Sequence, residues 1–89
     1  MSLEEIKTVF GSNRLSYNKI SAVDLANISK FVEVKLQMDK STLDYYYEIN
    51  VNDLAKSKIT SGELETMQKQ GWSFSDDNTK LIIYLTNSN

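Results

Sequence analysis

Tyrosine is the residue type in this chain best suited to making contacts, since five are present among 89 residues and three of them are consecutive. The run Tyr45-Tyr46-Tyr47 lies in residues 45–51, where apolar side chains alternate as in a β-strand. In a strand, Tyr45 and Tyr47 face one way and Tyr46 faces the other. A tyrosine ring offers a large apolar body with a polar end, and it is enriched in protein interfaces. Tyr46 is therefore a candidate contact residue on the outer face of a sheet.

A second strand should add to the same face. In residues 80–86, Leu81 and Ile83 fall on the side expected to be buried, which leaves Ile82 and Tyr84 pointing outward. An exposed patch of this kind is typical of a site that binds a partner. If the two hairpins are neighbours in the sheet, one patch results, and at opposite edges the patch divides. The predicted interface residues are Tyr46, Ile82, Tyr84, Glu48 and Lys35.

Most residue types that carry acid–base or metal chemistry are absent from the sequence. It contains no histidine and no cysteine, which removes the commonest general base near neutral pH, thiol catalysis and thiolate metal ligands. The acidic pairs Glu4-Glu5 and Asp76-Asp77 suit a helix N-terminus and a turn, and they lack the spacing of a calcium-binding loop. The glycines are isolated, so no phosphate-binding loop is present. We expect no enzymatic activity, no catalytic residue, no cofactor and no metal site.

Composition is that of an ordinary globular protein, with 40% hydrophobic and 25% charged residues. Residues 1–89 are expected to form one domain. The net charge of −2 gives no overall attraction to nucleic acid or anionic lipid.

The longest apolar run is too short to cross a bilayer, and the first residues lack a signal-peptide pattern, so the cytoplasm is the expected location. Frequent Asn, Ser, Lys, Ile and Tyr would suit an AT-rich genome, such as that of a phage.

Helix signals are strongest in the last third of the chain. Thr60 and Glu63 have the spacing of a capping box, so they predict a helix over residues 61–70. Gly71 stands where a helix commonly ends in a left-handed residue. Trp72 would then pack against the last turn of that helix, under the sheet.

The same reasoning predicts the other elements and an α+β fold class. We expect a small single domain in which two β-hairpins form an antiparallel sheet with helices on one face, in the order α-α-ββ-α-ββ. Residues 87–89 should form a frayed tail. The expected helices are residues 2–10, 21–29 and 61–70, with a short helical turn over 53–58 capped by Asn52. The expected strands are residues 31–39, 45–51, 72–75 and 80–86, with 14–20 as a further candidate.

A helix followed by a hairpin resembles half of a winged helix-turn-helix. In that alternative, helix 61–70 reads nucleic acid and hairpin 72–86 is the wing. The charge weighs against it, because residues 59–89 hold four acidic and two basic residues, and Asp76 and Asp77 occupy the wing tip where phosphate contacts are needed. We therefore expect a small accessory or regulatory factor that binds another protein, or a second copy of itself, through an exposed sheet face or edge.

Overall fold

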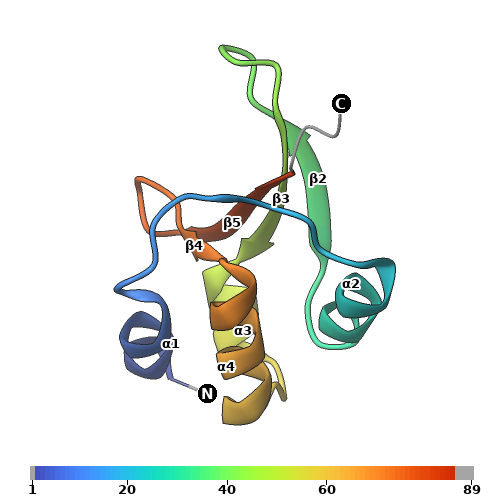
Figure 1. Ribbon diagram of the computed structural model, residues 1–89. Coiled ribbons are helices and arrows are strands. Elements are labelled where there is room, and N and C mark those ends of the chain that lie inside the picture. The colour runs from blue at the N-terminus through green and yellow to red at the C-terminus, as the bar shows by residue number, and fades with distance from the viewer. Residues whose placement is uncertain (1, 86–89) are drawn as a thin grey trace.

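The computed structural model describes residues 2–85 and has helices on one side of a mostly antiparallel sheet (Figure 1). The predicted α+β class is confirmed, and the predicted tail over 87–89 lies outside the described residues. The helices are α1 (Leu3–Phe10), α2 (Ala22–Ser29), α3 (Val51–Lys56) and α4 (Ser61–Gln70). The strands are β1 (Tyr17–Asn18), β2 (Val34–Met38), β3 (Tyr45–Asn50), β4 (Ser73–Phe74) and β5 (Lys80–Leu85).

Strand β5 lies at the centre of the sheet. The order is β1-β5-β3-β2, and β4 also pairs with β5. Strand β3 pairs antiparallel with both β2 and β5, whereas β1 pairs with β5 in parallel. The two predicted hairpins are therefore direct neighbours, which is the arrangement that allows their outward residues to form one patch.

The α4 helix begins and ends as its sequence predicts. The Thr60 side chain accepts a hydrogen bond from the Glu63 N–H, and the Glu63 carboxylate accepts one from the Thr60 N–H. At the other end, Gly71 has φ 103°, and the Trp72 N–H donates to the Met67 carbonyl. This is a Schellman ending, which satisfies carbonyls that the helix leaves unpaired. It also turns the chain so that Trp72 enters the core.

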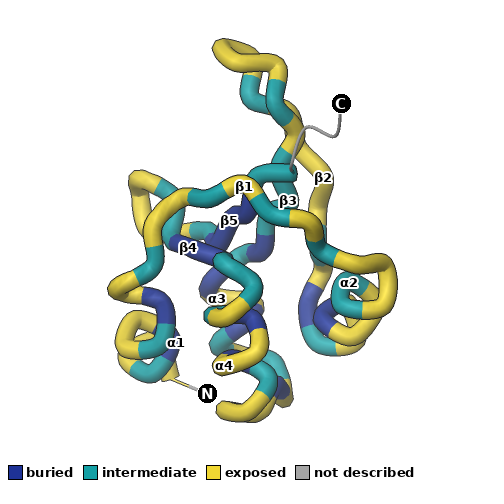
Figure 2. The backbone as a smooth tube through the Cα atoms, viewed as in Figure 1, coloured by how far each residue is buried: buried dark blue, intermediate teal, exposed yellow. Residues whose placement is uncertain are grey.

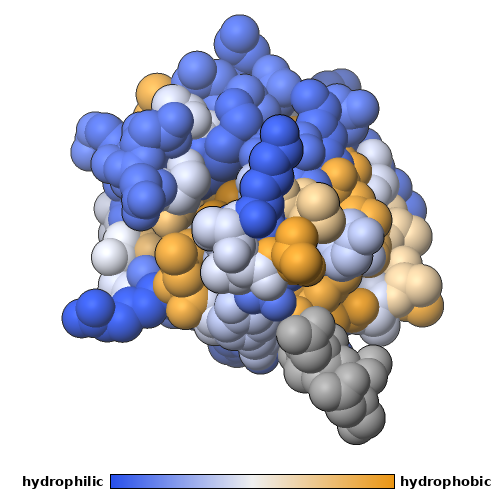
Figure 3. All heavy atoms as spheres, turned by 90° about the horizontal axis from the view of Figure 1, so that it is seen from above, coloured by the Kyte–Doolittle hydropathy of each residue, from blue (hydrophilic) through white to orange (hydrophobic). Residues whose placement is uncertain are grey.

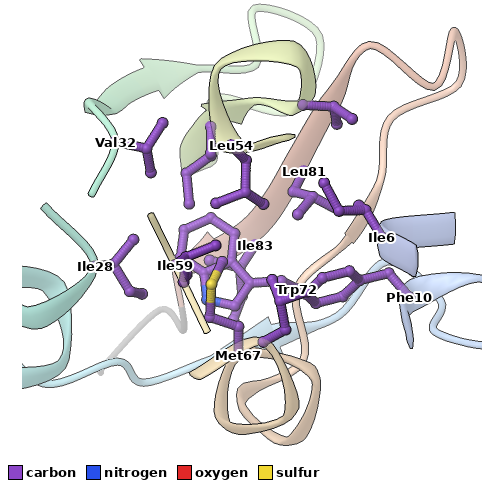
Figure 4. Packing of buried hydrophobic residues seen from close by; sticks show 13 residues of the cluster. Ile6, Phe10, Ile28, Val32, Leu54, Ile59, Met67, Trp72, Leu81 and Ile83 are labelled. Atoms are coloured by element: carbon purple, nitrogen blue, oxygen red, sulfur yellow. The ribbon is translucent and has the colours of Figure 1, made fainter. Parts of the chain in front are cut away.

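The hydrophobic core lies between the sheet and the helices. Trp72 is completely buried, and Figure 4 shows its indole close to Met67 and Ile83. One continuous cluster is expected in a domain of this size, and the structure has one. Its members are Ile6, Phe10, Ile28, Val32, Ile49, Val51, Leu54, Ile59, Leu64, Met67, Trp72, Leu81 and Ile83.

The predicted bounds of α3 and β2 are wrong by a few residues, and the candidate strand over 14–20 is reduced to β1. Helix α3 begins at Val51 and is capped by Asn50, not Asn52, because the Asn50 side chain accepts a hydrogen bond from the Asp53 N–H at 2.9 Å. Strand β2 begins at Val34 because residues 30–32 turn after α2, where the N–H groups of Phe31 and Val32 donate to the Ile28 carbonyl. In both places, local hydrogen bonding overrides the strand pattern.

The hairpin formed by β2 and β3 extends beyond the helices (Figures 1 and 2). The alternation of apolar residues in β2 predicts that Leu36 packs against the helices, and this prediction is wrong, since Leu36 is 56% exposed. Its neighbours on the same side, Met38 and Tyr45, are 42% and 52% exposed. The alternation of apolar residues continues past the part of the sheet that the helices cover, so these side chains lie uncovered.

Candidate functional site

Strand register places the outward residues in two rows across the face of the sheet that the helices leave open. Residues directly opposite each other in neighbouring strands point to the same face. The first row consists of Gln37, Tyr46, Tyr84 and Tyr17, from β2, β3, β5 and β1 respectively. The second row consists of Lys35, Glu48, Ile82 and Ser73, from β2, β3, β5 and β4.

In the first row the Tyr84 ring contacts the ring on either side of it, and we name Tyr17, Tyr84 and Tyr46 the tyrosine row. The ring centroids of Tyr17 and Tyr84 are 5.1 Å apart, and those of Tyr46 and Tyr84 are 5.3 Å apart. These distances fall in the range in which aromatic pairs attract. Tyr84, in the middle, is half-buried, whereas Tyr17 is 54% exposed. The row therefore presents ring surface to solvent along its length.

The segment that leads from α1 to β1 is held to the end of α4, and this positions Tyr17. The Asn13 side-chain amide donates to the Trp72 carbonyl at 2.6 Å, and the Ser16 hydroxyl donates to the Gly71 carbonyl at 3.1 Å. These bonds bring the chain alongside β5, where the parallel pairing of β1 begins.

Two aspartates on the β2–β3 hairpin receive hydrogen bonds from the tyrosine row. The Tyr84 hydroxyl donates to Asp39 Oδ2 at 3.2 Å, and the Tyr17 hydroxyl donates to Asp44 Oδ2 at 2.7 Å. The other oxygen of Asp39 accepts from the backbone N–H and the hydroxyl of Ser41, at 2.9 and 2.7 Å. The hydroxyls thus tie the row to the projecting hairpin and hold the rings in place.

These contacts move the pKa of each group away from neutrality. Burial raises the pKa of Tyr84, and the hydrogen bond to Asp39 raises it further. The hydrogen bond to Asp44 raises the pKa of Tyr17, and hydrogen bonds from Ser41 lower the pKa of Asp39. The row therefore presents neutral phenols beside an ionised carboxylate at physiological pH. General acid–base catalysis instead requires a group whose pKa lies near the working pH.

The open face is hollowed into a groove of about 640 Å³ between the β2–β3 hairpin and the turn that joins β4 to β5. Four carboxylates and two lysines line it, together with aromatic and aliphatic side chains. Figure 3 views the molecule from the side opposite the helices and shows apolar and pale surface bordered by hydrophilic surface. We name this hollow the open-face groove. Its lining is Leu15, Met38, Asp39, Lys40, Tyr46, Glu48, Ser75, Asp76, Asp77, Thr79, Lys80, Ile82 and Tyr84.

The carboxylates in the groove differ in how much of their bonding capacity the protein itself uses. Asp77 accepts hydrogen bonds from the Ser75 hydroxyl and from the Thr79 N–H and hydroxyl, and these lower its pKa to about 2. Glu48 and Asp76 form no ion pair and no side-chain hydrogen bond with any residue from 2 to 85. Two carboxylates are therefore free to meet a positively charged group.

The structure brings together most of the residues predicted for the interface. Tyr46, Tyr84 and Glu48 line the open-face groove. Ile82 also lines it, but the expectation that Ile82 is exposed is wrong, because it is only 7% exposed and forms part of the floor. Lys35 shares a row with Glu48 but lies on the edge strand outside the groove, where it forms an ion pair with Glu33 at 3.9 Å.

Reasoning from the sequence missed Tyr17 and the two aspartates that bind the tyrosine hydroxyls. Strand β1 has only two residues, too few for alternation to be recognised, and its pairing with β5 joins segments far apart in the chain. The candidate strand over 14–20 was the one signal that included Tyr17. Asp39 and Asp44 flank the hairpin turn, where aspartate has a sufficient local explanation.

Other kinds of site find less support in the described chain. Among residues 2–85, no three acidic side chains converge in a way that could hold a metal ion. No helix in that range has the length and apolar character needed to cross a bilayer. No protein-family model, no curated protein and no solved structure matches the chain.

Proposed function

We propose that this protein is a non-enzymatic binding factor whose open-face groove receives a positively charged, extended segment of another protein. The observation that carries the proposal is the tyrosine row, which hydrogen bonds to Asp39 and Asp44 hold in place. Glu48 and Asp76, in the adjoining groove, have no partner among residues 2–85. Rigid aromatic surface with a polar rim is how protein interfaces are commonly built.

The chemistry of the groove favours lysine or arginine side chains on the ligand. A cation placed over a tyrosine face is attracted by the ring, by about 0.5–1 kcal/mol when the site is exposed. Its charge can also reach Glu48 or Asp76, which have no partner among residues 2–85. Opposite charges at an interface accelerate association and select among partners. An extended segment suits the groove because it can follow the row from ring to ring.

The nucleic-acid alternative finds less support in this arrangement. Strand β5 of the supposed wing is the central strand of the sheet, with β3 on one side and β1 and β4 on the other. A wing that contacts phosphates needs free, basic loops. The β4–β5 turn instead carries Asp76 and Asp77 at the rim of the groove. An acidic aromatic groove repels phosphates and attracts basic peptides.

The test is a selection of short random peptides on the immobilised full-length protein. We expect the recovered peptides to be enriched in Lys and Arg, and their binding to weaken as salt rises. Replacing Tyr46 and Tyr84 together by serine should reduce affinity at least about tenfold, the effect of losing two interface aromatics. Far-UV circular dichroism should show that this double variant remains folded.

Tyr45→Ser provides the matched control. Tyr45 is 52% exposed but faces the opposite side of the same strand, so its replacement should leave peptide binding unchanged. Amide chemical shifts on titration should change along Tyr17, Tyr46 and Tyr84. Peptides that bind the double serine variant as tightly as the wild type would place the binding surface elsewhere and reject the proposal.

A further inference from the structure

Within residues 2–85, strand β2 is an open edge of the sheet. It is the last strand in the order β1-β5-β3-β2, and residues 35–38 are all exposed. Edge strands are commonly protected by proline, bulges or inward-pointing charges, because their unpaired backbone groups invite another strand. The chain has no proline, and β2 pairs with β3 in unbroken register from Val34 to Met38. This edge is therefore suited to pair with a further strand.

The free backbone groups of β2 can be identified from its pairing with β3. The Asp39 N–H donates to the Asp44 carbonyl at 2.8 Å, toward β3. Because N–H direction alternates along a strand, Gln37 and Lys35 also bond toward β3. Val34, Leu36 and Met38 then direct their N–H and C=O groups toward the open edge. A strand added here must form its hydrogen bonds with these three residues.

A second copy of the chain can supply that strand in a small number of registers. Antiparallel pairing of β2 with itself has a two-fold axis, which can pass through Lys35, Leu36 or Gln37 while using the outward groups. With the axis at Lys35, two lysines stand opposite each other. With the axis at Leu36, Lys35 faces the neutral Gln37. With the axis at Gln37, each Lys35 faces the Asp39 of the other copy.

We propose that the protein forms a two-fold dimer in which the β2 strands pair antiparallel about Gln37. In this register Leu36 and the second copy's Met38 exchange backbone hydrogen bonds, and the symmetric pair does the same. Two Lys35–Asp39 pairs form across the edge, and directly opposite unlike charges stabilise strand pairing whereas like charges oppose it. The weak ion pair of Lys35 with Glu33, at 3.9 Å between exposed groups, is no obstacle to this exchange.

The same register covers apolar surface that the monomer leaves exposed. Leu36 and Met38 are 56% and 42% exposed, and they share the helix-facing side of the sheet with Val34 but lie beyond the part that the helices cover. Paired about Gln37, they and their copies form one continuous strip beside Tyr45. The two-fold axis through Gln37 lies nearer the hairpin tip than the α2 end of β2. The helices of the two copies are therefore separated along the direction of the paired strands.

Single cysteines test the register directly, because the chain has none of its own. In Gln37→Cys, the two introduced residues face each other across the axis in a pair that shares no backbone hydrogen bonds, where Cα atoms lie about 4.5 Å apart. That spacing suits a disulfide. The matched control is Lys35→Cys, on the same face, whose copies would lie about 14 Å apart at a rise of about 3.4 Å per residue.

On mild oxidation of dilute full-length protein, we expect Gln37→Cys to form covalent dimer at least about tenfold faster than Lys35→Cys, given the distance limit on the bond. Equal rates, or a faster Lys35→Cys reaction, would overturn the proposed register. Sedimentation of the cysteine-free wild type up to about 1 mM, where weak edge contacts are populated, should show a reversible dimer. A strictly monomeric wild type would overturn the dimer itself.

Leu36→Pro is a second variant that separates folding from association. Proline is tolerated on an edge strand where the lost N–H faces solvent, so the monomer should keep its circular dichroism spectrum. The dimer should weaken at least about tenfold, because two symmetric backbone bonds are removed. A folded Leu36→Pro variant that associates as tightly as the wild type would show that β2 is not the contact strand.

Discussion

Replacing Trp72 by alanine is expected to remove a large part of the stability of this domain. The Trp72 side chain has no exposed surface, and it lies at the junction of α4 and β4. It is also the only tryptophan in the chain. Figure 4 shows the indole beside Met67 of α4 and Ile83 of β5.

The expected loss follows from burial. Truncating a fully buried aromatic residue to alanine costs about 3–5 kcal/mol. A domain of 89 residues has a total unfolding free energy of about 4–13 kcal/mol, at about 0.05–0.15 kcal/mol per residue. The melting temperature should fall by roughly 12–40 °C, since each kcal/mol shifts it by about 4–8 °C in a domain of this size.

The loss should come from the side chain and not from the backbone bonds at this position. The Trp72 N–H bonds the Met67 carbonyl, and the Trp72 carbonyl accepts from Asn13; alanine keeps both. The indole N–H donates to Gln70 Oε1 at 3.0 Å, so truncation also leaves that amide without its partner. Gln70 is half-buried and can turn to water, which limits this part of the cost.

Urea unfolding followed by far-UV circular dichroism is the appropriate assay, because the alanine variant has no tryptophan fluorescence. Trp72→Phe is the control, since a phenyl ring keeps part of the buried volume and should lose clearly less stability than the alanine variant. An alanine variant that melts within a few degrees of the wild type would refute the reasoning, since it would mean that the indole contributes little to the core.

Three further changes have defined outcomes. Gly71→Ala should cost more than about 1 kcal/mol in urea unfolding, because Gly71 has φ 103° and a Cβ there would clash with the Asn18 amide; an unchanged midpoint would contradict this. Thr60→Ala should cost about 1 kcal/mol as the α4 cap is lost, while Thr60→Ser should cost little. Asp77→Asn should destabilise the protein at neutral pH but not near pH 2. The folded pKa of Asp77 is about 2, below the ordinary 3.8, so its contribution is present above the ordinary value and is lost as pH falls through about 2. If the urea midpoints of Asp77→Asn and the wild type differed by the same amount at pH 7 and near pH 2, that linkage would be contradicted.

The part of the fold that the sequence predicted best depends on local interactions. The capping box of Thr60 and Glu63 and the left-handed Gly71 involve residues within one turn of each other. Such signals survive in any tertiary context, so the bounds of α4 were predicted correctly. The outward position of Tyr46 and Tyr84 follows from alternation alone. Their meeting in one patch needed the β3–β5 pairing, which local patterns do not specify.

The missed features depend on long-range packing. Whether Leu36 is buried is decided by how far the helices extend along the sheet, and nothing within β2 encodes that distance. Ile82 alternates as an outward residue should, yet the groove walls on either side cover it. Tyr17 enters the site because a two-residue strand adds to β5 in parallel. Alternation predicts which face a side chain occupies, but not what lies above that face.

Asp39 connects the two surfaces proposed for this protein. It accepts the Tyr84 hydroxyl inside the open-face groove, and in the proposed dimer it also faces Lys35 of the second copy. The two-fold axis of the proposed dimer is perpendicular to the sheet, so the open faces of the two copies lie on the same side. The dimer therefore presents two open-face grooves in one direction. A partner with two basic segments would gain avidity from such a pair. Because linkage is reciprocal, that partner would also stabilise the dimer, whereas a partner with one segment would bind each copy separately.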